Sequence, residues 1–396
     1  MNNNFPMLNT GYIYLDNGAT TWKPEPVIKK INEYYNDFTA NAHRGDYDIS
    51  LRVDNEYEGA RKIVADFINS DYKEVIFTSG TTDSLNLVAE GYFRKHLQKD
   101  DEIIINYAEH ASNVMPWFRL ANDLGVKVKF AALNDSNALT LDSIKEVVSD
   151  KTKLISLAMI TNVIGDLRDV KEIVKFAHER GIKVVVDGAQ SVPHIKTDVK
   201  DLDCDFLAFS GHKMCGPTGI GVLYGKYELL EEMEPRNLGG GMNASFDSPE
   251  EIELKSIPTR FEAGTPNIEG AIGLGAAIKY LESIGMDNIQ KHEVELKKYL
   301  VDELSKIEHI KMYNKDTISG TVVFNVDGIF SQDVAIYLSK YKICVRAGNH
   351  CAKLLKNKLG TDNTVRVSIY IYNTKEDVDK LVSLLQDKNK ILNEML

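Results

Sequence analysis

Two patterns of hydrophobic positions alternate along the first part of the chain. Short runs rich in Ile, Val and Leu are typical of buried strands. They lie at 75–77, 103–105, 126–131, 154–158, 183–187 and 205–209. Segments with apolar residues at helical spacing lie at 26–38, 52–69, 115–124, 141–148 and 170–180. Because strands that alternate with helices build parallel sheets, the pattern predicts an α/β fold with a mostly parallel sheet flanked by helices.

A second group of elements follows a long helical region at 268–304. Its short apolar runs predict strands at 320–326, 343–346 and 365–369. We therefore expect a smaller α+β domain beside the large one. The large domain is expected to span 17–285, and the small domain to combine 1–16 with 286–396.

Polar residues that could bind a ligand or take part in catalysis follow the predicted strands of the large domain. Thr81, His110, Asn162, Asp187 and Lys213 each lie at or just beyond the end of one strand. The carboxyl ends of parallel strands meet at one edge of a sheet, and ligands bind at that edge. We therefore expect these residues to share one site, although a lone histidine in a loop is often only a surface residue.

Lys213 and Asp187 form the most informative pair. Lys213 lies in a glycine-rich turn after a buried strand, where burial lowers an amine's pKa and allows it to form a Schiff base. A lone lysine flanked by glycines is more often a solvated turn residue. Asp187 ends a β-branched run, and a buried carboxylate needs a cationic partner. The pair is typical of pyridoxal phosphate enzymes, in which an acid holds the ring nitrogen.

The segment 78–82, Thr-Ser-Gly-Thr-Thr, joins a predicted strand to a predicted helix. Free backbone N–H groups, the helix dipole and hydroxyl groups converge at such a point and can bind a phosphate. An ordinary helix N-cap uses the same residue types. Because Asp187 and Lys213 are typical of pyridoxal phosphate enzymes, we favour the interpretation that this segment binds a phosphate.

Composition limits the classes of partner and compartment. The formal net charge of −11 disfavours a nucleic-acid-binding surface, and the sequence has no apolar stretch long enough to predict a membrane span. The four cysteines, Cys204, Cys215, Cys344 and Cys351, show no CxxC spacing, which disfavours a zinc site or a disulfide framework. We expect a cytoplasmic protein with reduced thiols.

Several motifs occur in the order found in one known family. They are Glu-His at 109–110, Asp-Gly-Ala-Gln at 187–190, Ser-Gly-His-Lys at 210–213 and Arg-Phe-Glu-Ala-Gly-Thr-Pro at 260–266. Through them the chain resembles the class V, fold-type I pyridoxal phosphate enzymes, and in particular the cysteine desulfurases, over residues 14–366. The resemblance implies the fold-type I architecture and pyridoxal 5'-phosphate as cofactor.

The resemblance also implies a role for each matching residue. Lys213 would bind the cofactor through a Schiff base, Asp187 would hold the pyridine nitrogen, Gln190 would reach the phenolic oxygen and His110 would stack on the ring. The phosphate would be bound by Thr81, Thr82, Ser210 and His212, and Asn162 would contact cofactor and substrate. A threonine matching Thr265 reaches the phosphate in the partner's site, which implies a homodimer.

The chemistry depends on the segment 346–351, Arg-Ala-Gly-Asn-His-Cys, which resembles the short-loop, SUF-type desulfurase motif. Cys351 is expected at the start of a helix with basic residues near it, an environment that favours the thiolate. The alternative is a small buried cysteine. Arg366 resembles the family's arginine for the substrate carboxylate, with Arg346 as a second candidate, although a strand-end salt bridge would also explain Arg366.

These expectations describe an enzyme that converts L-cysteine to L-alanine and keeps the sulfur as a persulfide on Cys351 for a sulfur-acceptor protein. One alternative is a selenocysteine lyase or another carbon–sulfur lyase, and a second is a catalytically inactive sulfur-relay protein. Asn349, Cys215 and Tyr47 depart from residues common in the family, so substrate preference stays open.

Overall fold

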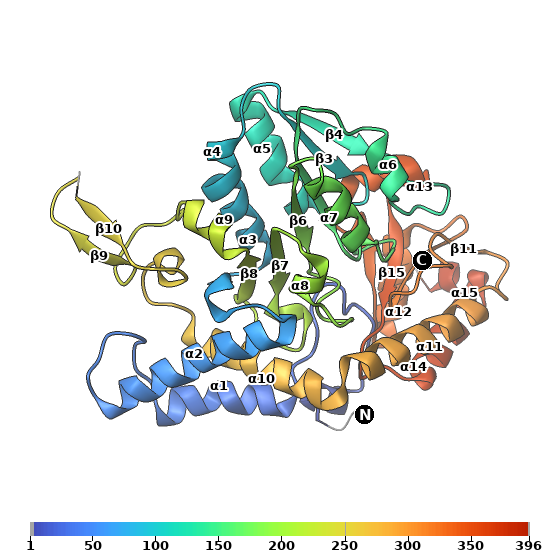
Figure 1. Cartoon of the computed structure of the whole chain (residues 1–396). Coiled ribbons are helices and arrows are strands. Elements are labelled where there is room, and N and C mark those ends of the chain that lie inside the picture. The colour runs from blue at the N-terminus through green and yellow to red at the C-terminus, as the bar shows by residue number, and fades with distance from the viewer. Residues whose placement is uncertain (1–3, 250, 395–396) are drawn as a thin grey trace.

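A seven-stranded sheet forms the centre of the computed structural model, which describes residues 4–249 and 251–394 (Figure 1). Side by side, its strands are β2 (Val75–Thr78), β8 (Gly221–Gly225), β7 (Phe206–Ser210), β6 (Lys183–Asp187), β5 (Thr152–Ala158), β3 (Glu102–Asn106) and β4 (Lys127–Ala131). Among these strands β8 runs antiparallel to both neighbours, and the others pair in parallel. The predicted mostly parallel sheet is therefore confirmed.

Alternate residues of the central strands pack into two different hydrophobic clusters. Along β6, Val184 and Val186 belong to one cluster and Val185 to the other, because successive side chains of a strand point to opposite faces. Helices that pack in the first cluster are α1 (Glu25–Asp37), α2 (Asp48–Ile68), α6 (Leu141–Lys145), α7 (Val170–His178), α8 (Val199–Leu202) and α10 (Ile268–Ile284). Helices in the second are α3 (Thr81–Val88), α5 (Met115–Leu124) and α9 (Tyr227–Glu232). Both faces are thus covered, as predicted.

A four-stranded antiparallel sheet forms the centre of the C-terminal part. Its order is β11 (Ile310–Met312), β12 (Thr321–Val326), β15 (Thr364–Ser368) and β14 (Arg346–Gly348). The helices of this part are α11 (Met286–Leu304), α12 (Ser331–Lys340), α13 (Lys356–Leu359), α14 (Lys375–Leu385) and α15 (Lys388–Asn393). Its hydrophobic cluster draws on Leu15 and on residues from Leu296 onward.

This cluster contains residues from both segments of the predicted small domain, and β1 (Ile13–Tyr14) pairs with β13 (Ile343–Cys344), which brings the N-terminal strand to this side of the molecule. The division at residue 285 stays a prediction, and the outermost residues of the predicted small domain, 1–3 and 395–396, lie outside the described residues.

Several element boundaries differ from the sequence prediction. Helix α2 begins at Asp48, before the predicted start at residue 52, and the predicted helix at 268–304 is two helices. Gly285 separates them with φ 89°, a left-handed conformation that glycine adopts without strain. The predicted strand at 343–346 is also divided, since β13 pairs with β1 and β14 with β15.

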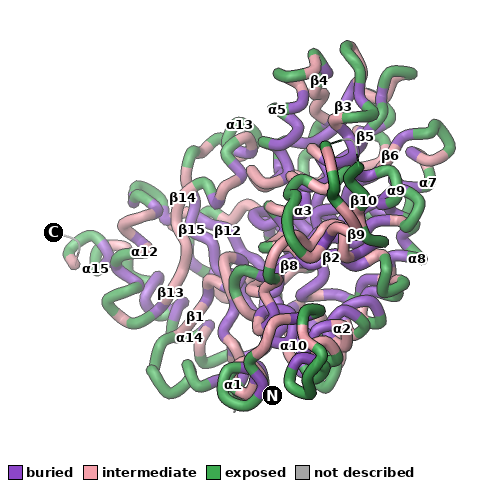
Figure 2. Tube along the Cα trace, turned by 90° about the vertical axis from the view of Figure 1, so that its left-hand side faces the viewer, coloured by how far each residue is buried: buried purple, intermediate pink, exposed green. Residues whose placement is uncertain are grey.

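A hairpin that the sequence analysis did not anticipate extends away from the central sheet (Figure 1). It consists of β9 (Asn243–Phe246) and β10 (Ile252–Leu254), paired antiparallel. Its surface is mostly intermediate or exposed (Figure 2), and Phe246 is 71% exposed. Large apolar side chains that face solvent on a projecting element are typical of an interface.

Among the helices of residues 4–249 and 251–394, none is long and apolar enough to cross a membrane.

The close approach of β8 to the start of α3 gives a first testable prediction. A Cβ atom added at Gly221 would lie 2.4 Å from the Cα of Gly80, whereas one added at Gly59 on α2 would meet nothing within 4 Å. We expect Gly221→Ala to lower the free energy of unfolding by about 1–3 kcal/mol. Gly59→Ala should raise it by about 1 kcal/mol, because alanine favours the helix.

Urea denaturation of both variants measures these changes. Equal stability of Gly221→Ala and the parent chain would contradict the tight packing of β8 against the turn before α3.

Candidate active site

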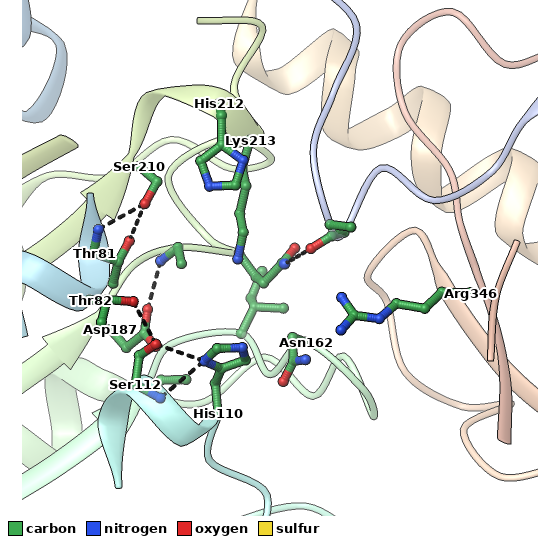
Figure 3. A pocket seen from close by; sticks show the side chains of 16 residues that line it. Thr81, Thr82, His110, Ser112, Asn162, Asp187, Ser210, His212, Lys213 and Arg346 are labelled. Atoms are coloured by element: carbon green, nitrogen blue, oxygen red, sulfur yellow. Dashed lines mark hydrogen bonds between the residues drawn. The ribbon is translucent and has the colours of Figure 1, made fainter. Parts of the chain in front are cut away.

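Side chains from the carboxyl ends of the strands enclose a cavity of about 180 Å³ (Figure 3). Of the residues predicted for the site, Thr81, Thr82, His110, Asn162, Asp187, Gln190, Ser210, His212, Lys213 and Arg346 line it. Ser112, which the sequence analysis missed, also lines it, together with Gly18 and Ala19 from the segment after β1. The convergence expected from strand order is therefore present, while the role of each residue stays a prediction.

Burial shifts the pKa values of Lys213 and Asp187 toward each other. Lys213 ends a short 3-10 turn (Gly211–Lys213) after β7, and burial lowers its pKa to about 8 despite the attraction of Asp187. Burial raises the pKa of Asp187 to about 6, and Oδ1 of this carboxylate accepts a hydrogen bond from the N–H of Ala189 at 2.9 Å. The site therefore combines an amine that loses its proton readily with a buried acid that favours a cationic partner.

The start of α3 and the end of β7 form a cluster of donors suited to a phosphate. Ser210 Oγ accepts from the N–H of Thr81 at 2.8 Å and lies 2.7 Å from Thr81 Oγ1. Thr82 Oγ1 lies 2.7 Å from Ser112 Oγ. Hydroxyl groups and the positive end of the helix dipole attract an anion at this position.

His110 forms one wall of the cavity as a neutral ring. Its Nδ1 accepts from the N–H of Ser112 at 3.1 Å, so Nδ1 carries the lone pair. Burial, with further repulsion from Lys213 and Arg346, lowers the pKa of His110 to about 3. A neutral imidazole at the cavity (Figure 3) can stack on a flat ring.

A buried ion network that the sequence analysis did not find supports this wall. Arg168 is fully buried and pairs with Glu109 and with Asp166, the latter at 3.0 Å. Glu109 also accepts from the N–H of Ala158, at the end of β5, at 2.9 Å. The network thus fixes the chain on both sides of Asn162, and the charged Asp-Leu-Arg segment at 166–168, after a buried strand, was the available signal.

Cys351 lies in a strained turn at the boundary between the two sheets. Its φ is 60° and that of His350 is 52°, left-handed values that cost about 1–3 kcal/mol each for residues other than glycine. Its Sγ lies 3.4 Å from a guanidinium nitrogen of Arg346, a cation that favours the thiolate. The helix expected to start at Cys351 is instead a 3-10 turn (Lys353–Leu355) followed by α13.

Arg346 and Arg366 face each other as direct cross-strand partners on β14 and β15. Like charges in this arrangement repel, and Arg366 is fully buried. Arg366 pairs with Asp16 at 2.9 Å, so the salt bridge given as its alternative role is present, and it also donates to the carbonyl of Asn162 at 3.0 Å. Its Nε has no hydrogen-bond partner in the described part of the chain. The pair is therefore suited to bind a carboxylate.

Unlike the other residues predicted for the site, Cys351, Arg366 and Thr265 do not line the cavity. Gln190 lines it and donates to the carbonyl of Gly18 at 2.8 Å. Thr265 is exposed and lies beside Asn41, whose side-chain nitrogen is 3.3 Å from Thr265 Oγ1, away from the cavity of its own chain. Within one chain the structure does not bring Thr265 to the site.

The residues present fit the cofactor that the resemblance implies. Pyridoxal phosphate needs an amine, an acid for its ring nitrogen and donors for its phosphate, and the cavity offers Lys213, Asp187 and the cluster around Thr81. In addition, the buried Oδ1 of Asn162 lacks a hydrogen-bond partner among the residues the structure describes. A ligand with hydrogen-bond donors would satisfy it.

Comparison with known proteins agrees with this geometry. The family described as aminotransferase class-V matches residues 13–381. A protein of Halalkalibacterium halodurans named a probable cysteine desulfurase is 45% identical, over 96% of this chain and 95% of its own length. The apo cysteine desulfurase of Thermococcus onnurineus superposes with a TM-score of 0.94 at 40% identity, over 98% of this chain and 97% of that one. The cysteine desulfurase CsdA of Escherichia coli, an S-sulfonic acid form, has a TM-score of 0.92 at 38% identity, over 99% and 98%.

Removal of the amine gives the second testable prediction. Lys213→Ala should fold normally but should not retain the visible absorbance of covalently bound pyridoxal phosphate, because no other lysine lines the cavity among the described residues. Absorption spectra before and after dialysis measure this. Retention of the wild-type absorption band by Lys213→Ala would exclude Lys213 as the attachment point.

Proposed function

We propose that this chain, which belongs to the aminotransferase class-V family, is a pyridoxal phosphate-dependent cysteine desulfurase. The overall reaction is L-cysteine plus the Cys351 thiol giving L-alanine plus a Cys351 persulfide. The observation that carries the proposal is the contact between the Cys351 thiol and Arg346, at 3.4 Å, because the side chain of Arg346 lines the cavity together with Lys213 and Asp187.

The bound cofactor supplies a carbonyl that captures amino groups and a protonated ring that withdraws electrons from the substrate's α-carbon. Asp187 holds the ring nitrogen as an ion pair in this proposal, which satisfies its buried carboxylate. Thr81, Ser210, Thr82 and His212 bind the phosphate, and His110 covers the ring as a neutral imidazole.

The amine of Lys213 moves the substrate proton. Since burial lowers its pKa to about 8, a useful fraction of Lys213 Nζ is unprotonated near neutral pH and can accept the proton from the α-carbon of L-cysteine. Arg346 and Arg366 bind the substrate carboxylate, and this anion relieves the repulsion between the two cations.

The Cys351 thiolate then attacks the substrate sulfur. A sulfur–sulfur bond forms as the carbon–sulfur bond breaks, and the electron pair left on carbon takes up protons to yield alanine. Arg346 stabilises the attacking thiolate, and the turn at 348–351 holds the thiolate beside this arginine.

Two partners complete the proposal. The first is a second copy of this chain, and it is supported by Thr265 and by the exposed apolar side chains of the hairpin. The two features lie close together, because the N–H of Gly264 donates to the carbonyl of Gly240, near the base of the hairpin, at 2.8 Å. A protein that accepts the persulfide sulfur is the second partner, and the free cysteines support a reducing, cytoplasmic setting.

The nucleophile gives the third testable prediction. Cys351→Ser should bind pyridoxal phosphate and show the wild-type spectral change with L-cysteine, but should form alanine at least about 100-fold more slowly, because serine cannot accept sulfur. Alanine and sulfide release with reductant present measure the effect, and Cys344→Ser is the matched control.

Full alanine production by Cys351→Ser would remove the nucleophile assignment. An enzyme that binds the cofactor but releases alanine only from selenocysteine would be a selenocysteine lyase.

The homodimer gives the fourth testable prediction. Light scattering should give twice the 44.4 kDa chain mass for the parent protein. Ile252→Asp, at a side chain that is 53% exposed on β10, should shift the mass toward the monomer, whereas Ile336→Asp, at one that is 56% exposed on α12, should not. A monomeric parent protein, or equal behaviour of both variants, would contradict the hairpin interface.

A further inference from the structure

His350 immediately precedes Cys351, yet its ring faces away from the cavity. The side chain is 2% exposed and packs against Thr364 on β15, beside Leu355 and Leu359. A histidine next to a nucleophilic cysteine is often read as its general base. The contacts of this ring support a different role.

The hydrogen bonds of the ring define its protonation. Nε2 lies 3.1 Å from the carbonyl oxygen of Thr364 and 2.9 Å from Thr364 Oγ1. Because a carbonyl only accepts, Nε2 carries the hydrogen, and Nδ1 has no partner in the part of the chain that the structure describes. Burial, with the cations of Arg366 and Arg346 nearby, lowers the pKa of His350 to about 3. The ring is therefore neutral under working conditions and does not carry a proton to or from Cys351.

The backbone around His350 depends on contacts from other elements. The side chain of Asn162 donates to the carbonyl of His350 at 2.7 Å, and the N–H of Ala111 donates to the carbonyl of Cys351 at 2.7 Å. Both bonds come from loops of the central sheet. The ring of His350 adds an anchor on the opposite side, to β15. Two consecutive left-handed residues persist only where surrounding contacts hold them in place.

We propose that His350 is a positioning residue for Cys351, whose ring fastens the strained turn to β15 so that the thiol stays beside Arg346. It acts through a neutral N–H donor and takes no part in proton transfer. The inference rests on the proposed function only in taking Cys351 as the nucleophile.

Two substitutions at His350 separate positioning from proton transfer. Glutamine places an N–H donor close to the position of Nε2 but cannot act as a base, whereas alanine removes the anchor. His309→Ala is the matched control, because His309 Nε2 contacts the carbonyl of Leu385 at 2.9 Å in the C-terminal part, away from the cavity. All variants are compared as loaded enzyme and as protein without cofactor.

The first readout is alanine formed in a single turnover by the loaded enzyme. The second is the rate of iodoacetamide alkylation at one fixed pH in the protein without cofactor, followed by mass spectrometry of the Cys351 peptide. Alkylation reports the position of the thiol without any contribution from turnover.

We expect His350→Ala to slow alanine formation by about 10- to 100-fold, the effect of a displaced reacting group. Alkylation of Cys351 should become slower, because the thiolate loses the cation beside it. His350→Gln should restore both readouts to near the parent values, and His309→Ala should leave both unchanged.

A glutamine variant as impaired as the alanine variant would overturn the proposal, and so would an alanine variant indistinguishable from the parent. If His350→Ala does not fold, His350→Gln decides alone: parent-like readouts support positioning, and their loss contradicts it. If the parent forms no alanine from L-cysteine, the proposed function fails, and the alkylation comparison still tests the role of His350.

Discussion

Desolvation of opposite charges at one edge of the central sheet is the constraint on which the site depends. Lys213 follows β7 and Asp187 ends the neighbouring strand β6, and burial moves both pKa values toward neutrality. Neither group would have this reactivity on the surface, where water stabilises the charged forms. The parallel sheet therefore holds the two groups in place and also provides the burial that shifts their pKa values.

Further charged side chains are buried near this edge of the sheet, and they differ in whether an opposite charge lies beside them. Arg168 pairs with both Glu109 and Asp166 behind His110, and Glu109 also accepts from the N–H of Ala158, so each of these carboxylates has a cationic partner. Arg346 and Arg366, by contrast, face each other with only Asp16 as a counter-ion among the described salt bridges. The molecule thus pairs its structural charges and keeps an excess of positive charge where an anionic substrate group would bind.

Much of this arrangement could be predicted from the sequence, because it depends on local patterns. Short β-branched runs mark the strands, and the polar residue after each run marks the edge at which ligands bind, which is how Asp187, Lys213 and Asn162 were found. Arg168 was missed although its partner Asp166 is a near neighbour in the sequence, because its second partner, Glu109, lies 59 residues away. The left-handed turn at His350 and Cys351 also depends on distant contacts, from Asn162 and Ala111. Thr265 lies beside Asn41, away from the cavity of its own chain, so its predicted role depends on a partner chain.

The central claim is that sulfur leaves the substrate by transfer to Cys351. The most direct test is mass spectrometry of the Cys351 peptide after the loaded enzyme is mixed, without reductant, with L-cysteine carrying isotope-labelled sulfur. The account predicts one labelled sulfur atom added to Cys351 and none to Cys204, Cys215 or Cys344. Labelled sulfide in solution with an unmodified Cys351, or label on another cysteine, would contradict it.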